Sequence, residues 1–110
     1  MSVHHKELSQ GRWFDLPFFE QMANIGSEVG RTISWRKKKK EYSDLAFKRA
    51  LELLDLTIGD QKNRPRLKEL TRLRETLADY FFFDNSYGSS DEKWQSYFYP
   101  FNYAARRSRY

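Results

Sequence analysis

The stretch "ANIGSEVGRTISWRKKKK", from Ala23 to Lys40, combines a helical pattern with two glycines and a run of basic residues. Apolar residues recur here at spacings of three and four, which is typical of one face of an α-helix. The stripe consists of Phe18, Met22, Ile25, Val29 and Ile33. We therefore expect a helix over about 16–38, with Asp15 as its cap and Pro17 in its first turn.

Two more stripes of the same period follow along the chain. The first begins near Tyr42 and stops at Gly59, a residue that favours helix ends. Its apolar members are Phe47, Ala50, Leu51, Leu54 and Ile58. The turn "GDQKNRP", with Asn63 as a candidate cap, precedes a predicted helix over 65–83. The members of that stripe are Leu67, Leu70, Leu73, Leu77 and Phe81.

The polar segment "DNSYGSS", at 84–90, predicts a loop before a fourth helix. Ser89 and Glu92 have the spacing of a capping box, and Trp94 begins the apolar face of this helix. Pro100 removes a backbone donor, so we expect a kink there or a helix that ends and restarts.

No segment alternates with the period of a strand, and the four amphipathic segments are joined by short connections. This pattern predicts an all-α fold, an antiparallel up-down-up-down four-helix bundle. We expect one domain over 1–110, with a mobile N-terminus at 1–14 and a basic tail at 106–110.

Composition places the chain among globular proteins, because 39% of its 110 residues are hydrophobic and 17% are aromatic. The absence of cysteine excludes disulfides and thiolate chemistry and suits a reducing compartment. No apolar run has the length of a membrane span, and the first residues lack the apolar core of a signal peptide. These features predict a cytoplasmic protein without integral membrane association.

Ala23, Gly26 and Gly30 share one face of the first helix, and each glycine costs about 1 kcal/mol there relative to alanine. The favoured interpretation is close packing, in which an aromatic ring of the fourth helix lies against this face. The alternative is an interface with a ligand or with another subunit.

The segment "NIGSEVGR" at 24–31 resembles a motif of small, uncharacterised prokaryotic four-helix-bundle proteins. It is more remotely similar to bundle proteins encoded by intervening sequences of large-subunit ribosomal RNA genes, which carry an Asn-Ile-Ala-Glu-Gly-x-Gly-Arg type of motif. The residues that match in type are Asn24, Ile25, Glu28, Gly30 and Arg31. One extra residue stands between the second and third of these, and only "RWFDLPFFEQ" precedes the motif where the family has a full helix.

The resemblance implies a bundle that assembles with further copies of itself. Relatives of that family, the accessory proteins of diversity-generating retroelements, form rings that bind nucleic acid and a reverse transcriptase. For this chain, the resemblance therefore favours a homo-oligomeric binding module.

Basic residues gather at both expected ends of the bundle, and the net charge is +5. One end collects the run 36–40, near Asp84, Asp91 and Glu92. The other collects Lys62, Arg64, Arg66, Arg106, Arg107 and Arg109. Such a balance favours polyanions, and phosphate contacts would supply affinity without sequence specificity. The candidate phosphate-binding residues are Arg36, Lys37, Lys38, Lys39, Lys40, Arg64, Arg66, Arg106 and Arg107. Trp35 is a candidate stacking platform for unpaired bases, and Tyr42, Tyr87 and Tyr110 also flank basic segments.

The residue types required by common enzyme mechanisms are missing. The two histidines, His4 and His5, lie in the expected mobile N-terminus, and no strand-linked phosphate loop or metal-ligand spacing is present. We therefore expect no enzyme, no metal and no cofactor, but an accessory protein that binds RNA or DNA. The alternatives are a protein-interaction module whose basic residues are solvated surface, and a protein that docks on an anionic membrane surface.

Overall fold

The computed structural model describes residues 11–107, and every regular element in this range is helical. In chain order the elements are α2 (Trp13–Asp15), α3 (Phe18–Trp35), α4 (Lys40–Gly59), the 3-10 helix η2 (Gln61–Arg66), α5 (Leu67–Phe82) and α6 (Asp91–Arg107). The all-α class expected from the sequence is confirmed. Arg106 and Arg107 complete α6 instead of belonging to a tail, whereas the predictions for 1–10 and Tyr110 lie outside the described residues.

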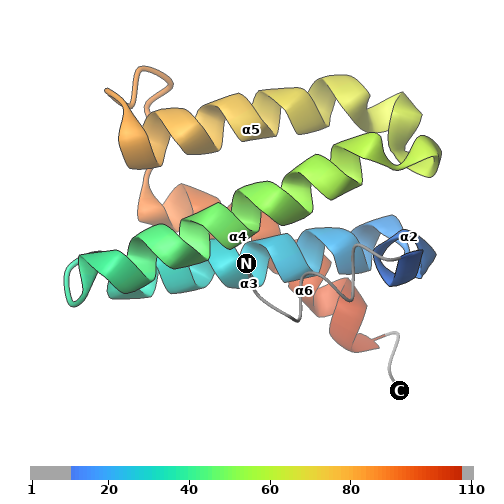
Figure 1. Cartoon of the computed structure of the whole chain (residues 1–110), viewed down its shortest axis with the longest axis horizontal. Coiled ribbons are helices and arrows are strands. Elements are labelled where there is room, and N and C mark those ends of the chain that lie inside the picture. The colour runs from blue at the N-terminus through green and yellow to red at the C-terminus, as the bar shows by residue number, and fades with distance from the viewer. Residues whose placement is uncertain (1–10, 108–110) are drawn as a thin grey trace.

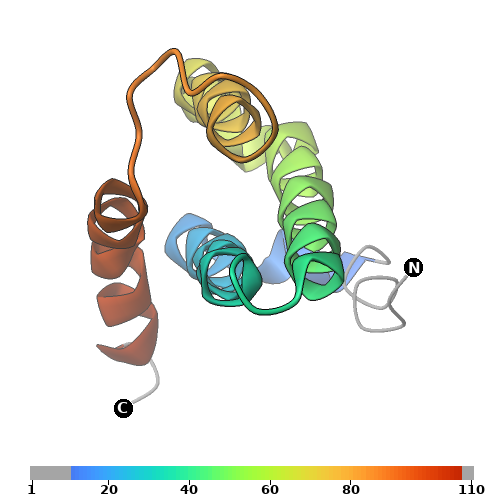
Figure 2. The same cartoon turned by 90° about the vertical axis from the view of Figure 1, so that its left-hand side faces the viewer.

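Successive long helices reverse direction along the chain (Figure 1). Helix α3 packs closely on both α4 and α6, and α5 lies along α4. In the view of Figure 2, the four long helices follow an arc in the order α5, α4, α3, α6. This order places α3, which carries the glycines and leads into the basic run, at the centre of the helix packing.

The predicted stripes supply most of the core. The buried members of these stripes are Met22, Ile25, Val29, Phe47, Ala50, Leu54, Leu70, Leu73, Leu77, Trp94 and Phe98. Each such large side chain contributes about 1.5–3 kcal/mol by leaving water, so the core depends on the helical period of these residues. The prediction is wrong for Leu67, which begins α5 and is 44% exposed.

Aromatic side chains connect α5 to α6. The rings of Tyr80 and Trp94 lie 6.5 Å apart between centroids, and the Tyr97 hydroxyl donates a hydrogen bond of 3.1 Å to Glu69. Burial, together with the Glu69 carboxylate, raises the pKa of Tyr97. Large rings can span a helix separation that short side chains would leave unfilled.

The expectation of a mobile segment through residue 14 is wrong for Trp13, which lies in α2 and is fully buried. Its indole N–H donates to the Thr57 hydroxyl at 3.1 Å, and its carbonyl accepts a hydrogen bond of 3.0 Å from the Gln21 amide. Such a bond offsets the cost of burying the polar N–H of an indole. A helix of three residues is too short to show a period, so the pattern could not reveal it.

Buried polar side chains tie α3 to the turn after α4. The Gln21 amide donates to Asp60 at 2.9 Å and accepts from Asn63 at 2.9 Å, while Asn63 also donates to the Thr57 carbonyl at 3.0 Å. Asn63 therefore does not cap α5 as expected, because its side chain is engaged in the core. Burial raises the pKa of Asp60, but hydrogen bonds from Lys62 and Gln21 outweigh this effect and hold the pKa below its usual value.

The predicted caps differ from those in the structure. Asp15 closes α2, and α3 begins after Pro17 without a side-chain cap. At the start of α6, the Ser90 hydroxyl accepts a hydrogen bond of 3.1 Å from the Lys93 N–H, so Ser90 and not Ser89 is the capping residue. Helix α6 also continues without interruption through Pro100, which excludes an end and restart there.

The predicted loop between α5 and α6 is present and is held by one carboxylate. Asp79 accepts hydrogen bonds from the Ser86 N–H at 2.9 Å, the Ser86 hydroxyl at 3.1 Å and the Tyr87 N–H at 3.1 Å. Burial raises the pKa of Asp79, but these three bonds outweigh it and lower the pKa overall. The hydrogen bonds that hold the loop therefore favour the ionised form of Asp79.

Candidate nucleic-acid interface

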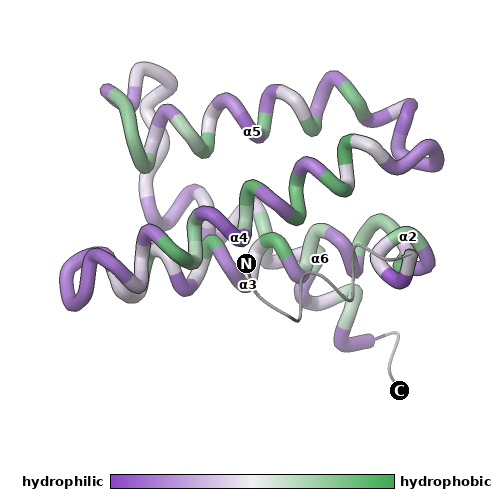
Figure 3. Tube along the Cα trace, in the orientation of Figure 1, coloured by the Kyte–Doolittle hydropathy of each residue, from purple (hydrophilic) through white to green (hydrophobic). Residues whose placement is uncertain are grey.

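The basic turn, defined here as Trp35–Tyr42, joins α3 to α4 at one end of the molecule and is strongly hydrophilic (Figure 3). The N–H groups of Lys38 and Lys39 donate to the Trp35 carbonyl at 2.9 and 2.8 Å. These bonds reverse the chain within the run of cations. The side chains of 37–40 are consequently exposed on a tight, hydrogen-bonded support.

Trp35 and Tyr42 form an exposed aromatic pair across the basic turn. Their ring centroids are 5.1 Å apart with an interplanar angle of 90°, and 37% of Trp35 and 46% of Tyr42 remain accessible. The Lys39 ammonium lies 5.2 Å from the centroid of the Tyr42 ring. The turn thus presents aromatic surface beside positive charge, the combination on which unpaired bases stack.

Two of the five consecutive cations have carboxylate partners. Arg36 pairs with Asp91 at 3.4 Å and lies over the Tyr80 ring, 4.7 Å from its centroid. Lys40 pairs with Asp44 at 3.0 Å, one helical turn along α4. Within residues 11–107, no ion pair engages the three lysines between them, at 37–39.

The anchor of the turn is the group formed by Arg36, Tyr80 and Asp91. The Tyr80 hydroxyl donates a hydrogen bond of 2.6 Å to the same Asp91 oxygen that pairs with Arg36. Burial and the Asp91 carboxylate raise the pKa of Tyr80. These contacts fix the turn against α5 and α6 and border a hollow of about 440 Å³. The residues that line it are Ile33, Ser34, Arg36, Lys37, Lys38, Tyr80 and Asp91.

The arginines predicted to form the second basic end lie in two separate places, in η2 and at the end of α6. Arg64 and Arg66 lie exposed in η2, where the Arg66 guanidinium is 4.2 Å from the centroid of the Phe18 ring. Lys62 pairs with Asp60 and donates to the Phe14 carbonyl at 3.1 Å. In Figure 1, α2 and the start of α3 lie between η2 and the end of α6. The structure therefore does not gather these arginines with Arg106 and Arg107.

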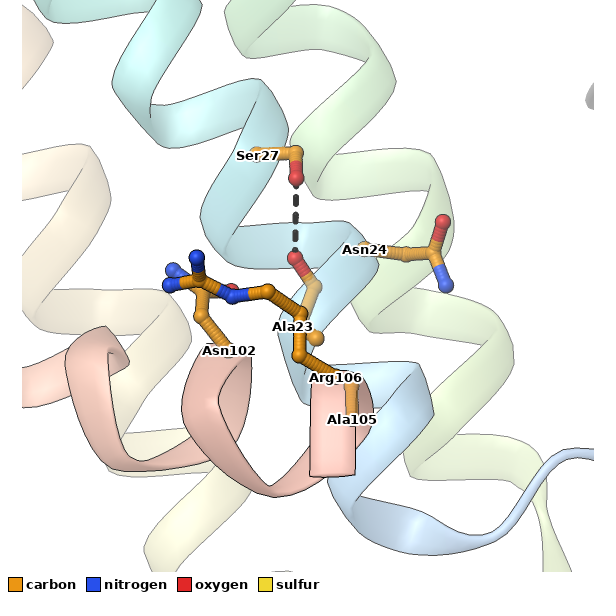
Figure 4. Close-up of a pocket in the computed structure, with 6 residues that line it drawn as sticks. All are labelled: Ala23, Asn24, Ser27, Asn102, Ala105 and Arg106. Atoms are coloured by element: carbon orange, nitrogen blue, oxygen red, sulfur yellow. Dashed lines mark hydrogen bonds between the residues drawn. The ribbon is translucent and has the colours of Figure 1, made fainter. Parts of the chain in front are cut away.

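The two arginines at the end of α6, Arg106 and Arg107, have surroundings different from those of the arginines in η2. Arg106 lies at a hollow of about 280 Å³ between α3 and α6, together with Ala23, Asn24, Ser27, Asn102 and Ala105 (Figure 4). Asn24 and Ser27 donate hydrogen bonds to carbonyls of their own helix. Arg107 donates to the Tyr103 hydroxyl at 3.2 Å.

The two glycines of α3 have different surroundings. A Cβ atom at Gly26 would lie 2.8–2.9 Å from side-chain atoms of Phe98, so close packing with α6 requires the missing side chain there. A Cβ at Gly30 would meet nothing within 4 Å. Ala23 precedes both glycines on the same face of α3 and lines the hollow that Arg106 also borders. Packing thus explains Gly26 but not Gly30.

Phe82 and Phe83 were not singled out by their pattern, because they follow the apolar stripe of α5. They are 54% and 73% exposed. Phe82 also lines a hollow of about 290 Å³ that reaches the basic turn through Arg36 and Lys40. Adjacent phenylalanines at the end of an amphipathic helix are the signal that could have indicated an exposed aromatic surface.

Within residues 11–107, no group of histidine and carboxylate side chains could hold a metal ion, and no helix is long and apolar enough to cross a membrane. No protein-family model, curated protein or solved structure matches the chain.

Proposed function

We propose that this chain is a non-enzymatic, cytoplasmic accessory protein that binds single-stranded nucleic acid through the basic turn. In this proposal the helices form an antiparallel four-helix bundle that assembles with further copies. Lys37, Lys38 and Lys39 contact backbone phosphates, and Trp35 with Tyr42 stacks on unpaired bases. Arg36 positions the turn, and no metal or cofactor takes part.

One observation carries this proposal: the pairing of the outer cations, Arg36 and Lys40, leaves the three central lysines without carboxylates in the described part of the chain. A run of cations that served only as solvated surface would not require an adjacent pair of exposed aromatic rings. Lysines supply the salt-dependent part of nucleic-acid affinity, and stacking on an aromatic ring adds about 1–3 kcal/mol per base.

Tryptophan fluorescence provides a direct test. Of the three tryptophans, Trp13 and Trp94 are buried and Trp35 is exposed. A base that stacks on the protein surface and quenches tryptophan emission therefore reports on Trp35. Titration of the full chain with a short single-stranded RNA at low salt should quench this signal, and added salt should restore it. A chain that leaves the emission unchanged and shows no fluorescence-anisotropy binding at low salt would contradict the proposal.

Charge-reversal variants distinguish binding at the basic turn from non-specific attraction to a basic protein. The variant Lys37→Glu/Lys38→Glu should lose binding, because it replaces two phosphate contacts with repulsion. The variant Lys48→Glu/Lys68→Glu has the same net charge, alters exposed lysines of α4 and α5, and should retain most of the affinity. Equal losses in both variants would indicate non-specific attraction. Circular dichroism would verify that both remain helical.

Protein docking through α6 is the second candidate, since Tyr99 and Tyr103 are 52% and 50% exposed and line a hollow of about 520 Å³ with Arg106 and Arg107. Trp94 is buried and is excluded from such a surface. This candidate predicts that Tyr99→Ala/Tyr103→Ala changes the assembly of the chain, as measured by light scattering. It is distinguished from the first candidate by Lys37→Glu/Lys38→Glu, whose loss of RNA binding would favour the basic turn.

A further inference from the structure

Phe82, the last residue of α5, is a large apolar side chain that the fold leaves at the surface beside the basic turn. It is 54% exposed, yet its ring lies 5.0 Å from that of the buried Phe47, so its position is fixed by packing. An exposed ring that is supported by the core can stack on a ligand without first losing side-chain freedom.

The hollow beside Phe82 connects it to cations of the basic turn. Arg36 lines this hollow from the basic turn just after α3, Lys40 lines it from the start of α4, and Phe82 lines it from the end of α5. Ser43 also borders it, but the Ser43 hydroxyl donates to the Thr32 carbonyl at 2.7 Å and is therefore already used. Aromatic surface and positive charge thus meet a second time, in a hollow that neither Trp35 nor Tyr42 lines.

We propose that Phe82 is a second base-stacking platform, so that the ligand is an unpaired strand spanning the basic turn from the Trp35–Tyr42 pair to Phe82. This inference rests on the proposed function. Lys37–Lys39 bind phosphates between the platforms, and Arg36 and Lys40 border the pocket that receives the second base. Duplex nucleic acid does not fit this arrangement, because its bases are not available for stacking.

Among the described residues that line this hollow, Asp44 is the one carboxylate, and it accepts hydrogen bonds from the Lys40 ammonium at 3.0 and 3.3 Å. The pair reduces the positive charge that Lys40 offers to a phosphate. The hollow is therefore better suited to an uncharged base than to the backbone, which agrees with a stacking role for Phe82.

The test measures anisotropy with labelled oligouridines of roughly 3 to 16 nucleotides, a range that covers the site sizes of single-strand-binding folds. Affinity should rise with length and then level once a strand reaches both platforms. Phe82→Leu keeps an apolar contact to Phe47 but lacks a ring. Because one stacked base is worth about 1–3 kcal/mol, Phe82→Leu should weaken the binding of long strands by roughly 5-fold or more. It should leave the binding of the shortest strands unchanged.

Two variants control this measurement. Phe83→Leu alters a neighbouring exposed ring that does not line the hollow, and it should bind like the wild type. Phe82→Tyr retains a stacking ring and should restore the affinity for long strands. Thermal unfolding of each variant shows whether a loss of binding reflects a loss of structure.

The outcomes separate this inference from the proposed function. If Phe82→Leu binds all lengths like the wild type while Lys37→Glu/Lys38→Glu loses binding, the second platform is wrong and the basic turn stands. If the wild type binds no oligouridine, both proposals are wrong. If the wild type instead binds phosphatidylserine vesicles and Phe83→Leu abolishes that binding, the exposed phenylalanines serve a membrane surface and the second platform is overturned.

Discussion

The indole N–H of Trp13 donates a hydrogen bond of 3.1 Å to the hydroxyl of Thr57 and so joins α2 to the end of α4. The Thr57 hydroxyl in turn donates to the Leu53 carbonyl at 2.8 Å. Both members of the pair are fully buried. A segment that precedes the four long helices is therefore part of the core.

Replacing Trp13 should destabilise the protein strongly. Trp13→Ala should lower the free energy of unfolding by about 3–5 kcal/mol, because a fully buried indole leaves a cavity. Trp13→Phe keeps most of the ring and should cost less. Phe14→Ala changes a side chain that is 41% exposed and serves as the control. Urea denaturation followed by circular dichroism provides the measurement, and similar losses at both positions would contradict the burial of Trp13.

The two glycines of α3 should respond in opposite directions to alanine. Gly26→Ala places a methyl group 2.8–2.9 Å from Phe98 and should cost about 1–3 kcal/mol through overpacking. Gly30→Ala meets nothing within 4 Å and should stabilise the helix by up to about 1 kcal/mol. Thermal unfolding of the two variants, which introduce the same methyl group, compares them directly. Destabilisation by Gly30→Ala would show that another group covers this position.

Stability should fall in acid partly through Asp79. Because its folded pKa lies below the unfolded value of 3.8, its contribution is complete above 3.8 and is lost as the pH falls through the folded pKa. Asp79→Asn should destabilise the protein at neutral pH and make its stability less dependent on pH in this window. Asp84→Asn removes an exposed carboxylate nearby and is the control. Unfolding midpoints between neutral and acid pH test this, and parallel curves for Asp79→Asn and wild type would refute it.

The two serines before α6 should differ in importance. Ser90→Ala removes the acceptor of the Lys93 N–H and should cost about 0.5–2 kcal/mol. Ser89 uses its backbone N–H and carbonyl to bond Asn85, and these bonds survive Ser89→Ala. Chemical denaturation of both variants is the measurement. A larger loss for Ser89→Ala would support the capping box that the sequence predicted.

The salt dependence of RNA binding should report on the three central lysines. On a single strand, each neutralised phosphate contributes about 0.7 to the slope of log K against log salt concentration. Lys37→Gln/Lys38→Gln/Lys39→Gln should therefore reduce the slope by about 2. Lys40→Gln should change it less, since Lys40 pairs with Asp44. A slope unchanged by the triple variant would assign the phosphate contacts elsewhere.

The sequence predicted the helices well because Met22, Ile25 and Val29 repeat with the helical period and are buried. It failed at Gln21 and Asn63, which are polar yet buried. Their burial depends on hydrogen bonds between segments 42 residues apart, and local patterns do not contain such partners. The capping error at Ser89 has a different origin, because the adjacent Ser90 is an equally suitable capping residue and accepts the bond from Lys93.

At the candidate site, the sequence predicted the surroundings of the basic turn better than those of the second basic end. It placed Arg36 near Asp91, and the structure shows this ion pair. It grouped Arg66 with Arg107 at one end, although they lie on elements separated by α2 and α3. The grouping assumed ideal helix ends, whereas the position of each arginine depends on how α6 lies against α3.

The attachment of Trp13 also sets an order for synthesis of the chain. Its partner is made 44 residues later, which corresponds to a delay of about 2 to 9 seconds at common translation speeds. During this interval the indole of Trp13 lacks the partner with which it is buried in the folded protein. The indole of Trp13 therefore cannot be buried until the end of α4 has left the ribosome, and until then it should be accessible to chaperones.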